Sequence, residues 1–259
     1  MSTVTGVPSK VMKKKRIDKF FSKKKMKIED FKFTKKVATV FDNMVSRSVP
    51  FYNESQEYGI EIATRFIQPN SKIYDLGCST GTNLINLDKK LGKLKIKNCK
   101  YFGIDNSQPM IDVFNKKIDK IKNKKNFKLI SGDMKEIDFE KNISVFFMSY
   151  TLQFIRPLDR ENLIKKIYKS LKNNGCIILL EKILVNDSYL NRSYIDIYYD
   201  YKIKQGYSNI EIQKKREALE NVLIPYRQSE NYQMLKKSGF KKIDSFFQWF
   251  NWMGFIAIK

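Results

Sequence analysis

The stretch KIYDLGCSTGTNLINLDKKLG (residues 72–92) joins a short apolar segment to an amphipathic helical segment through a glycine-containing loop. Its central part, YDLGCSTGTN (residues 74–83), contains Gly77-Cys78-Ser79-Thr80-Gly81 and so matches the pattern G-x-S-x-G. That pattern can mark the nucleophile elbow of a serine hydrolase. It also fits a loop that closes over a nucleotide-like ligand at the start of a helix. The composition of the whole chain separates these two interpretations.

The chain of 259 residues contains no histidine. A Ser-His-Asp triad needs an imidazole with a near-neutral pKa to accept the serine proton. A Ser-Lys pair would not need this elbow, so the hydrolase interpretation of Ser79 is disfavoured. The lack of histidine also weakens any histidine-ligated metal site, and we expect no metal. The three cysteines (Cys78, Cys99 and Cys176) show no C-x-x-C spacing, which argues against a disulfide framework and a structural zinc site.

Length and hydropathy predict one large domain, with or without a cap. Hydrophobic residues make up 42% of the chain, which is enough for a substantial core. No apolar run reaches the ~18–20 residues of a membrane span. The first residues lack the apolar region of a secretory signal. We therefore expect a cytoplasmic protein with no membrane association.

The formal net charge is +23, from 50 basic and 27 acidic residues. Such a charge can indicate a polyanionic partner such as RNA. The alternative is a compositional bias, which we favour because lysine is scattered over almost every polar segment. Only residues 1–27, which include KVMKKKRIDKFFSKKKMK, concentrate the charge. We predict that this basic arm is disordered, and direct binding of tRNA stays an open question.

From residue 72 onward, apolar strand-like segments alternate with amphipathic helical ones. This alternation predicts an α/β fold with a doubly wound, mostly parallel sheet of about seven strands. Near-continuous apolar strands support a parallel sheet that is covered on both faces. Two final segments, 240–250 and 252–259, predict a C-terminal antiparallel hairpin with a turn of about one residue. The five parallel strands are expected at 72–76, 100–105, 127–133, 143–149 and 176–182.

Helix boundaries follow from the capping residues. Thr80 or Thr82 is a candidate N-cap for the first helix after the sheet begins, and Ser107 is a candidate for the second. Gly175 is expected to stop the helix that begins near residue 159. Two helices are predicted before residue 72, with a break at Pro50. Residues 28–259 are thus interpreted as one domain, with a helical cap inserted at about 186–222.

Three polar positions follow the first three predicted strands. Asp75 and the loop at Gly77 suit the amine and the carboxylate of an amino-acid moiety. Asp105 ends the second strand, where a carboxylate can bind both ribose hydroxyls. Asp133 ends the third strand and can accept from an adenine amino group, while Met134 packs on the ring. Together these positions predict binding of S-adenosylmethionine.

Six segments together resemble the carboxy-S-adenosyl-L-methionine synthase family, which has the class I methyltransferase topology. The resemblance covers roughly residues 30–259, excludes the basic arm, and is most specific in its last segment. The segments are RSVPFY (47–52), YDLGCSTG (74–81), IDNSQPMI (104–111), TLQF (151–154), LLEK (179–182) and GYSNIEIQKKREALENV (206–222).

The resemblance implies a reaction in which S-adenosylmethionine and prephenate yield carboxy-S-adenosylmethionine, phenylpyruvate and water. In the family proposal, the methyl group loses a proton and attacks carbon dioxide released from prephenate. The resemblance also implies a homodimer, with residues 186–222 at its interface. The product is passed to a tRNA carboxymethyltransferase that builds 5-oxyacetic acid uridine at the wobble position.

The resemblance also assigns residues to roles. Arg216 matches the arginine that binds the new carboxylate, a role that suits its planar fork. Where the family pattern implies asparagine after the fourth strand, this chain has Ser149, which is shorter and lacks the amide. No residue is an evident general base, which agrees with a substrate that supplies its own base. The expected S-adenosylmethionine contacts are Tyr52, Gly77, Cys78, Ser79, Asp105, Asn106, Asp133, Met134, Ser149 and Arg216.

Two other functions remain as alternatives. An ordinary methyltransferase acting on a small molecule or RNA would share the fold, but it would not need Arg216 near the transferred carbon. A non-enzymatic RNA-binding protein would fit the charge and would show a steep salt dependence. That second alternative leaves Asp105 and Asp133 unexplained.

Overall fold

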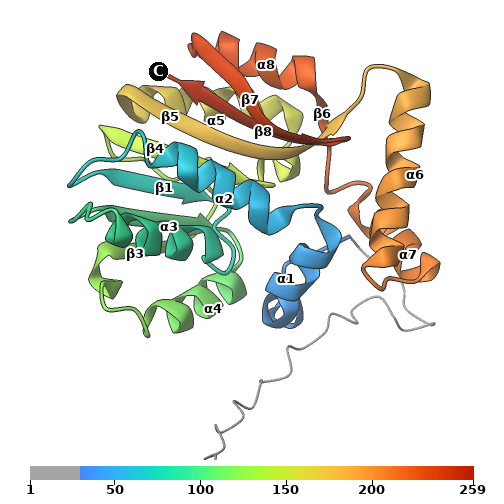
Figure 1. Cartoon of the computed structure of the whole chain (residues 1–259), viewed down its shortest axis with the longest axis horizontal. Coiled ribbons are helices and arrows are strands. Elements are labelled where there is room, and N and C mark those ends of the chain that lie inside the picture. The colour runs from blue at the N-terminus through green and yellow to red at the C-terminus, as the bar shows by residue number, and fades with distance from the viewer. Residues whose placement is uncertain (1–29) are drawn as a thin grey trace, which may run out of the picture.

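The computed structural model describes residues 30–259, so the predicted basic arm at residues 1–27 lies outside the described residues. The described chain is a twisted sheet with helices on both faces and a group of helices at one end (Figure 1). The helices are α1 (Lys35–Ser48), α2 (Tyr52–Ala63), α3 (Thr82–Lys93), α4 (Gln108–Ile118), α5 (Pro157–Ser170), α6 (Ser188–Lys204), α7 (Asn209–Leu219) and α8 (Gln228–Lys237). The strands are β1 (Lys72–Leu76), β2 (Lys100–Asp105), β3 (Phe127–Ser131), β4 (Ile143–Ser149), β5 (Leu171–Leu184), β6 (Tyr226–Arg227), β7 (Lys242–Trp249) and β8 (Trp252–Ile258).

The sheet has the strand order β3-β2-β1-β4-β5-β8-β7. Its first five strands pair in parallel, and β8 pairs antiparallel with both β5 and β7. The order reverses between β1 and β4, so the crevice at the carboxyl ends of these strands is where a doubly wound sheet binds its ligand. The predicted fold class, a mostly parallel sheet with a C-terminal hairpin, is confirmed.

Successive side chains of β5 point to opposite faces of the sheet, so they belong to two separate cores. Ile177 and Leu179 belong to the core beneath α5 and α8, whereas Cys176 and Ile178 belong to the core beneath α2, α3 and α4. Because both faces of the strand are buried there, the central residues 176–180 (CIILL) are apolar without interruption. The site-forming loops therefore extend from the buried centre of the sheet.

A third core holds the end of the molecule beyond the carboxyl ends of the parallel strands. Phe41 and Met44 of α1 pack there with Tyr198 of α6 and Ala218 of α7. Figure 1 shows α6 and α7 together at the end of the sheet, with α1 between them and the parallel strands. Both α6 and α7 fall inside the segment 186–222, where sequence periodicity predicts helices.

Several predicted boundaries are wrong. The N-cap of α3 is Gly81, and neither Thr80 nor Thr82 takes that position, because both hydroxyls donate to Asp42 Oδ1 of α1, at 2.5 and 3.3 Å. Helix α5 ends at Ser170, and Gly175 lies within β5. The early end is set by pairing with β4, since Leu171 is already in register with Ile143.

The remaining differences concern strands. The hairpin turn contains two residues, Phe250 and Asn251, and Phe250 has a left-handed backbone with φ 47°. The short strand β6 was not predicted, because two residues carry no periodicity. It pairs in parallel with the end of β5, at Ile183 and Leu184. Ser107 does occupy the N-cap position of α4, as predicted, although its hydroxyl makes no capping hydrogen bond.

Candidate functional site

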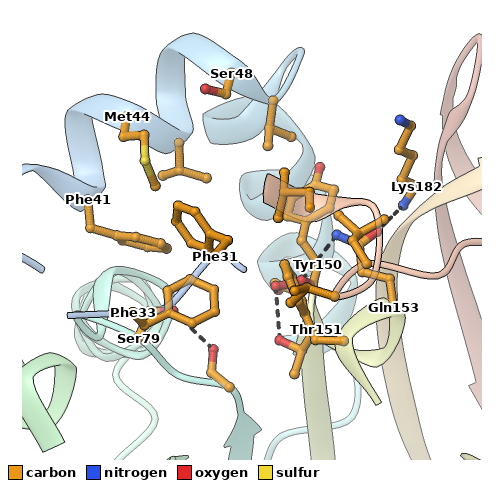
Figure 2. A pocket seen from close by; sticks show the side chains of 18 of the residues that line it. Phe31, Phe33, Phe41, Met44, Ser48, Ser79, Tyr150, Thr151, Gln153 and Lys182 are labelled. Atoms are coloured by element: carbon orange, nitrogen blue, oxygen red, sulfur yellow. Dashed lines mark hydrogen bonds between the residues drawn. The ribbon is translucent and has the colours of Figure 1, made fainter. Parts of the chain in front are cut away.

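A cavity of about 800 Å³ lies at the carboxyl ends of β1, β2 and β4, between these strands and the helices α1, α6 and α7. In Figure 2, Phe41, Met44 and Ser48 of α1 line one side, and Tyr150, Thr151, Gln153 and Lys182 line the other. Phe31 and Phe33 precede α1 and also line the cavity (Figure 2). The crevice predicted from the strand order is thus roofed by aromatic side chains from the N-terminal helix and its approach.

The loop after β1 presents its backbone to this cavity. Gly77, Ser79 and Gly81 all have left-handed conformations, with φ of 76°, 49° and 78°. A Cβ at Gly77 would lie 2.3 Å from the Thr151 hydroxyl, and one at Gly81 would lie 2.1 Å from the Phe114 ring. These two positions therefore require glycine, and the curled loop exposes backbone at the start of α3.

Asp105 joins this loop to the end of β2. Its Oδ2 accepts from the Ser79 amide at 2.9 Å, and its Oδ1 accepts from the Ser107 amide, also at 2.9 Å. Burial raises the pKa of this carboxyl, while the two amides counteract the rise. Each oxygen keeps a further lone pair, so the fixed carboxylate can accept from two adjacent hydroxyls.

Asp75 lies at the floor of the cavity and is incompletely paired. Its Oδ2 accepts from Asn83 Nδ2 at 3.4 Å, but its Oδ1 has no partner among the described residues, and neither has Asn83 Oδ1. Burial raises the pKa of Asp75 to about 7. Unpaired buried oxygens are costly, so these two fit a donor that arrives with a ligand, such as an ammonium group.

Of the two adenine contacts predicted after β3, only one lines the cavity. Met134 is buried and lines the cavity. Asp133 is not among the lining residues. Its Oδ1 accepts from the Lys135 amide at 2.9 Å, and its Oδ2 lies 3.6 Å from Lys135 Nζ. In this arrangement, the carboxylate of Asp133 is engaged by the turn that follows β3.

The end of β4 is held by a buried acid from β5. Glu181 accepts from the amides of Leu152 and Gln153, each at 2.9 Å. Burial raises the pKa of Glu181 to about 8. Gln153 Oε1 in turn accepts from the Lys182 amide at 3.0 Å (Figure 2). The segments TLQF and LLEK therefore form one structural unit, which places Gln153 in the cavity wall.

Tyr52 and Ser149 both line the cavity. Tyr52 begins α2, after the left-handed Phe51, and its ring stacks on Tyr150 at 5.8 Å between ring centroids. The Ser149 carbonyl accepts from the Thr151 hydroxyl at 3.2 Å. Ser149, the position at which the family pattern implies asparagine, is therefore part of the cavity wall.

The cap contributes cations to the same cavity. Arg216 of α7 lines the cavity, and a hydrogen bond with Tyr199 of α6 raises its pKa. Lys182, Lys202 and Lys215 also line the cavity and were not predicted as site residues. Lys182 and Lys215 lie within the resemblance segments LLEK and GYSNIEIQKKREALENV, but the resemblance gave them no role. Lys202 lies outside these segments and is one among 50 basic residues.

The structure therefore brings nine of the ten predicted contact residues to one cavity and leaves Asp133 at its edge. The nine are Tyr52, Gly77, Cys78, Ser79, Asp105, Asn106, Met134, Ser149 and Arg216.

Within the described part of the chain, no three potential metal-binding Cys, Asp or Glu side chains come together. None of the helices over residues 30–259 is long and apolar enough to cross a membrane.

The strand order, the glycine loop after β1 and the acid at the end of β2 define a class I S-adenosylmethionine-dependent methyltransferase fold. Residues 73–175 match the family model described as a methyltransferase domain. Among solved structures, phosphoethanolamine N-methyltransferase 2 from Haemonchus contortus, in complex with S-adenosyl-L-methionine, superposes with a TM-score of 0.61 at 14% identity. The superposition covers 88% of this chain and 57% of that protein, and it supports the fold.

Two curated relatives define the family more narrowly. The carboxy-S-adenosyl-L-methionine synthase of Nautilia profundicola is 49% identical over 93% of this chain and 99% of the relative. The enzyme of the same name from Methylococcus capsulatus is 43% identical over the same shares of both chains. The chain belongs to the carboxy-S-adenosyl-L-methionine synthase family. It is accordingly a transferase built on a methyltransferase fold.

Proposed function

We propose that this protein carboxylates S-adenosylmethionine, with prephenate as the carboxyl donor, to give carboxy-S-adenosylmethionine, phenylpyruvate and water. The observation that carries the proposal is Arg216, a permanent cation in the same cavity as Asp75 and Asp105. A methyltransferase transfers a methyl group that carries no carboxylate and does not need a cation there, whereas a new carboxylate on that carbon pairs with one. Relatives at 43% and 49% identity are named carboxy-S-adenosyl-L-methionine synthase, which supports the formation of this product.

The residues present suit the bound nucleoside. Asp105 accepts from the ribose hydroxyls, Asp75 accepts from the amine, and the glycine loop after β1 lies beside the amino-acid end. Bound S-adenosylmethionine supplies a methyl group that the neighbouring sulfonium charge makes acidic. In the balanced reaction, the bond between the prephenate ring and its carboxylate breaks as the ring hydroxyl leaves, which gives phenylpyruvate and carbon dioxide. One proton leaves the methyl carbon of S-adenosylmethionine, and this carbon forms the new bond to the carbon dioxide. The hydroxyl lost from prephenate takes that proton and leaves as water.

Mass spectrometry of the nucleoside fraction tests this reaction directly. The purified protein is incubated with S-adenosylmethionine and prephenate, and parallel samples contain phenylpyruvate or no second substrate. We expect carboxy-S-adenosylmethionine only in the sample with prephenate. If only unmodified S-adenosylmethionine is recovered, the carboxylation proposal is wrong and the ordinary methyltransferase becomes the better function.

Arg216→Ala tests the carboxylate contact. Loss of the guanidinium should weaken binding of carboxy-S-adenosylmethionine by about tenfold or more, because a bidentate charge-assisted pair is lost. Binding of S-adenosylmethionine should change little. Arg192→Ala, which removes an exposed arginine of α6 with a surface pair to Asp196, is the matched control. Equal affinities of the Arg216 variant and the parent for both nucleosides would contradict the assigned role.

The wider setting of the reaction follows from the same proposal. The product would pass to a tRNA carboxymethyltransferase for modification of wobble uridine to 5-oxyacetic acid uridine. A homodimer stays a prediction of the family resemblance, a cytoplasmic location stays a prediction of the sequence, and direct tRNA binding stays open. Light scattering at several protein concentrations tests the dimer, and a monomer throughout would contradict it.

A further inference from the structure

Three lysine side chains converge on the part of the cavity that is formed by the cap. Lys182 comes from β5, Lys202 from α6 and Lys215 from α7. Lys182 Nζ and Lys202 Nζ lie 5.3 and 4.3 Å from the centroid of one ring, that of Tyr198. Lys215 Nζ donates to Ser48 Oγ at 2.8 Å. The Tyr198 hydroxyl donates to the Ser48 carbonyl at 2.8 Å, so one tyrosine connects the three lysines.

Within the described part of the chain, Lys182 and Lys202 have no ion pair with an acid, in contrast to surface lysines such as Lys90 and Lys165. Lys202 and Lys215 are 5% and 8% exposed, and Lys182 faces the cavity. A buried ammonium group without an acid is costly unless a ligand supplies the opposite charge.

The electrostatics of the cluster agree with its geometry. Burial lowers the pKa of Lys182 to about 8. The pKa of Lys202 is lowered well below its ordinary value by burial and by repulsion from Lys215 and Lys182. Other titratable groups around the cluster are the tyrosines of α6 and its turn, Arg47 of α1 over the Tyr207 ring, Arg216 of α7, and Glu220, which is the C-cap of α7. Glu220 is exposed and acts on the pKa of Arg216.

We propose that Lys182, Lys202 and Lys215 form an anion subsite that binds the carboxylates of a small dianionic second substrate beside the nucleoside. The Tyr198 and Tyr199 rings, tilted by 39° against each other, supply aromatic surface that suits a cyclic carbon skeleton. The subsite rests on the proposed function, because prephenate is a cyclic dicarboxylate, and it assigns residues to that substrate. An anion stabilises the charged lysines, so binding must raise their pKa values and draw protons from solution.

Calorimetry on protein loaded with S-adenosylhomocysteine tests the subsite without turnover, because that nucleoside carries no methyl group to react. Prephenate is titrated at about pH 7 and about pH 9, in buffers of different ionisation enthalpy. We expect proton uptake that is larger at the higher pH, since more of the lysine is neutral there before binding. Malonate serves as a second dicarboxylate probe without a ring.

Variants identify the residues responsible. Lys182→Met and Lys202→Met should each weaken prephenate binding by about tenfold or more and reduce the proton uptake. Lys204→Met, which removes an exposed lysine of the same helix α6, is the matched control and should bind as the parent does. Unchanged affinity for S-adenosylhomocysteine shows that each variant is folded. A lysine with a merely structural role would leave the proton count unchanged.

The outcomes separate the subsite from the proposed function. If carboxy-S-adenosylmethionine forms but both lysine variants bind prephenate as the parent does, the subsite is wrong and the function stands. If no carboxylated product forms but malonate or prephenate binds in a lysine-dependent manner, the subsite stands and the function fails. If the parent binds neither dicarboxylate, the subsite proposal is overturned.

Discussion

At the scale of single residues, Asp75 is the group whose ionisation should control binding of the nucleoside. Its pKa is raised to about 7 by burial, so the empty protein holds a proton there in mild acid. A ligand ammonium group favours the ionised carboxylate, and binding therefore releases that proton. Affinity for S-adenosylmethionine should rise as the pH increases toward about 7 and then level off.

Asp75→Asn checks this assignment. The amide cannot ionise, so the variant should lose the pH dependence and bind about 10- to 100-fold more weakly at neutral pH. Calorimetry between about pH 6 and about pH 8 measures both effects. A variant that keeps the parent's pH dependence would show that another group is responsible.

Asp75 should also make the free energy of unfolding depend on pH. Between the unfolded value of 3.8 and the folded value of about 7, the native state holds a proton that the unfolded chain has lost. The free energy of unfolding must therefore fall as the pH rises through this window. Asp75→Asn should remove this component, and denaturant titrations at several pH values measure it.

At the scale of elements, the start of α3 depends on a glycine that has no substitute. Gly81 combines φ 78° with a Cβ position 2.1 Å from the Phe114 ring. Gly81→Ala should lower the free energy of unfolding by about 2 kcal/mol or more, from backbone strain and overpacking. Gly92, in the same helix, has nothing within 4 Å of its Cβ position.

Gly92→Ala is therefore the natural control and should stabilise the protein by about 0.5 kcal/mol through helix propensity. Urea denaturation measures both substitutions. Similar effects of the two alanines would mean that the contact with Phe114 does not constrain the loop.

A second element-scale prediction concerns the unit formed by Glu181 and the turn after β4. Glu181→Gln replaces one acceptor oxygen by a donor NH₂ opposite an amide N–H. The loss of one buried hydrogen bond should lower the free energy of unfolding by about 1–3 kcal/mol. Glu161→Gln, which breaks an exposed pair with Lys165, is the control and should cost less than about 1 kcal/mol. Equal costs would show that the buried acid is not what holds the turn.

At the scale of the whole molecule, the lining of the cavity begins at Phe31 among the described residues 30–259. Removal of residues 1–27 should therefore leave the formation of carboxy-S-adenosylmethionine and the Tm unchanged. Removal of residues 1–34 also deletes Phe31 and Phe33 and should weaken nucleoside binding, because two aromatic walls are lost. Kinetics and thermal melts of the two shortened chains measure the difference. A loss of activity with the shorter deletion would assign the basic arm to the reaction.

The doubly wound sheet with its terminal hairpin, the predicted S-adenosylmethionine loop and the acid after β2 could all be inferred from local sequence, whereas the class I topology came from the family resemblance. Each depends on a short-range rule: apolar strands that alternate with helices, glycine at left-handed positions, and a carboxylate at a strand end. The N-cap of α3 and the end of α5 could not be inferred in this way. They depend on Asp42 binding the two threonines and on the register between Leu171 and Ile143.

The sequence alone therefore determined the fold class and the nucleoside-facing half of the site, because those features are encoded within a few residues of one another. Only the tertiary structure decided the other half. Lys182, Lys202 and Lys215 meet around Tyr198 because β5, α6 and α7 are packed together, and no local pattern distinguishes them from the other lysines. Burial, which lowers the pKa of Lys182 and Lys202 and raises that of Asp75, is a property of the packed molecule.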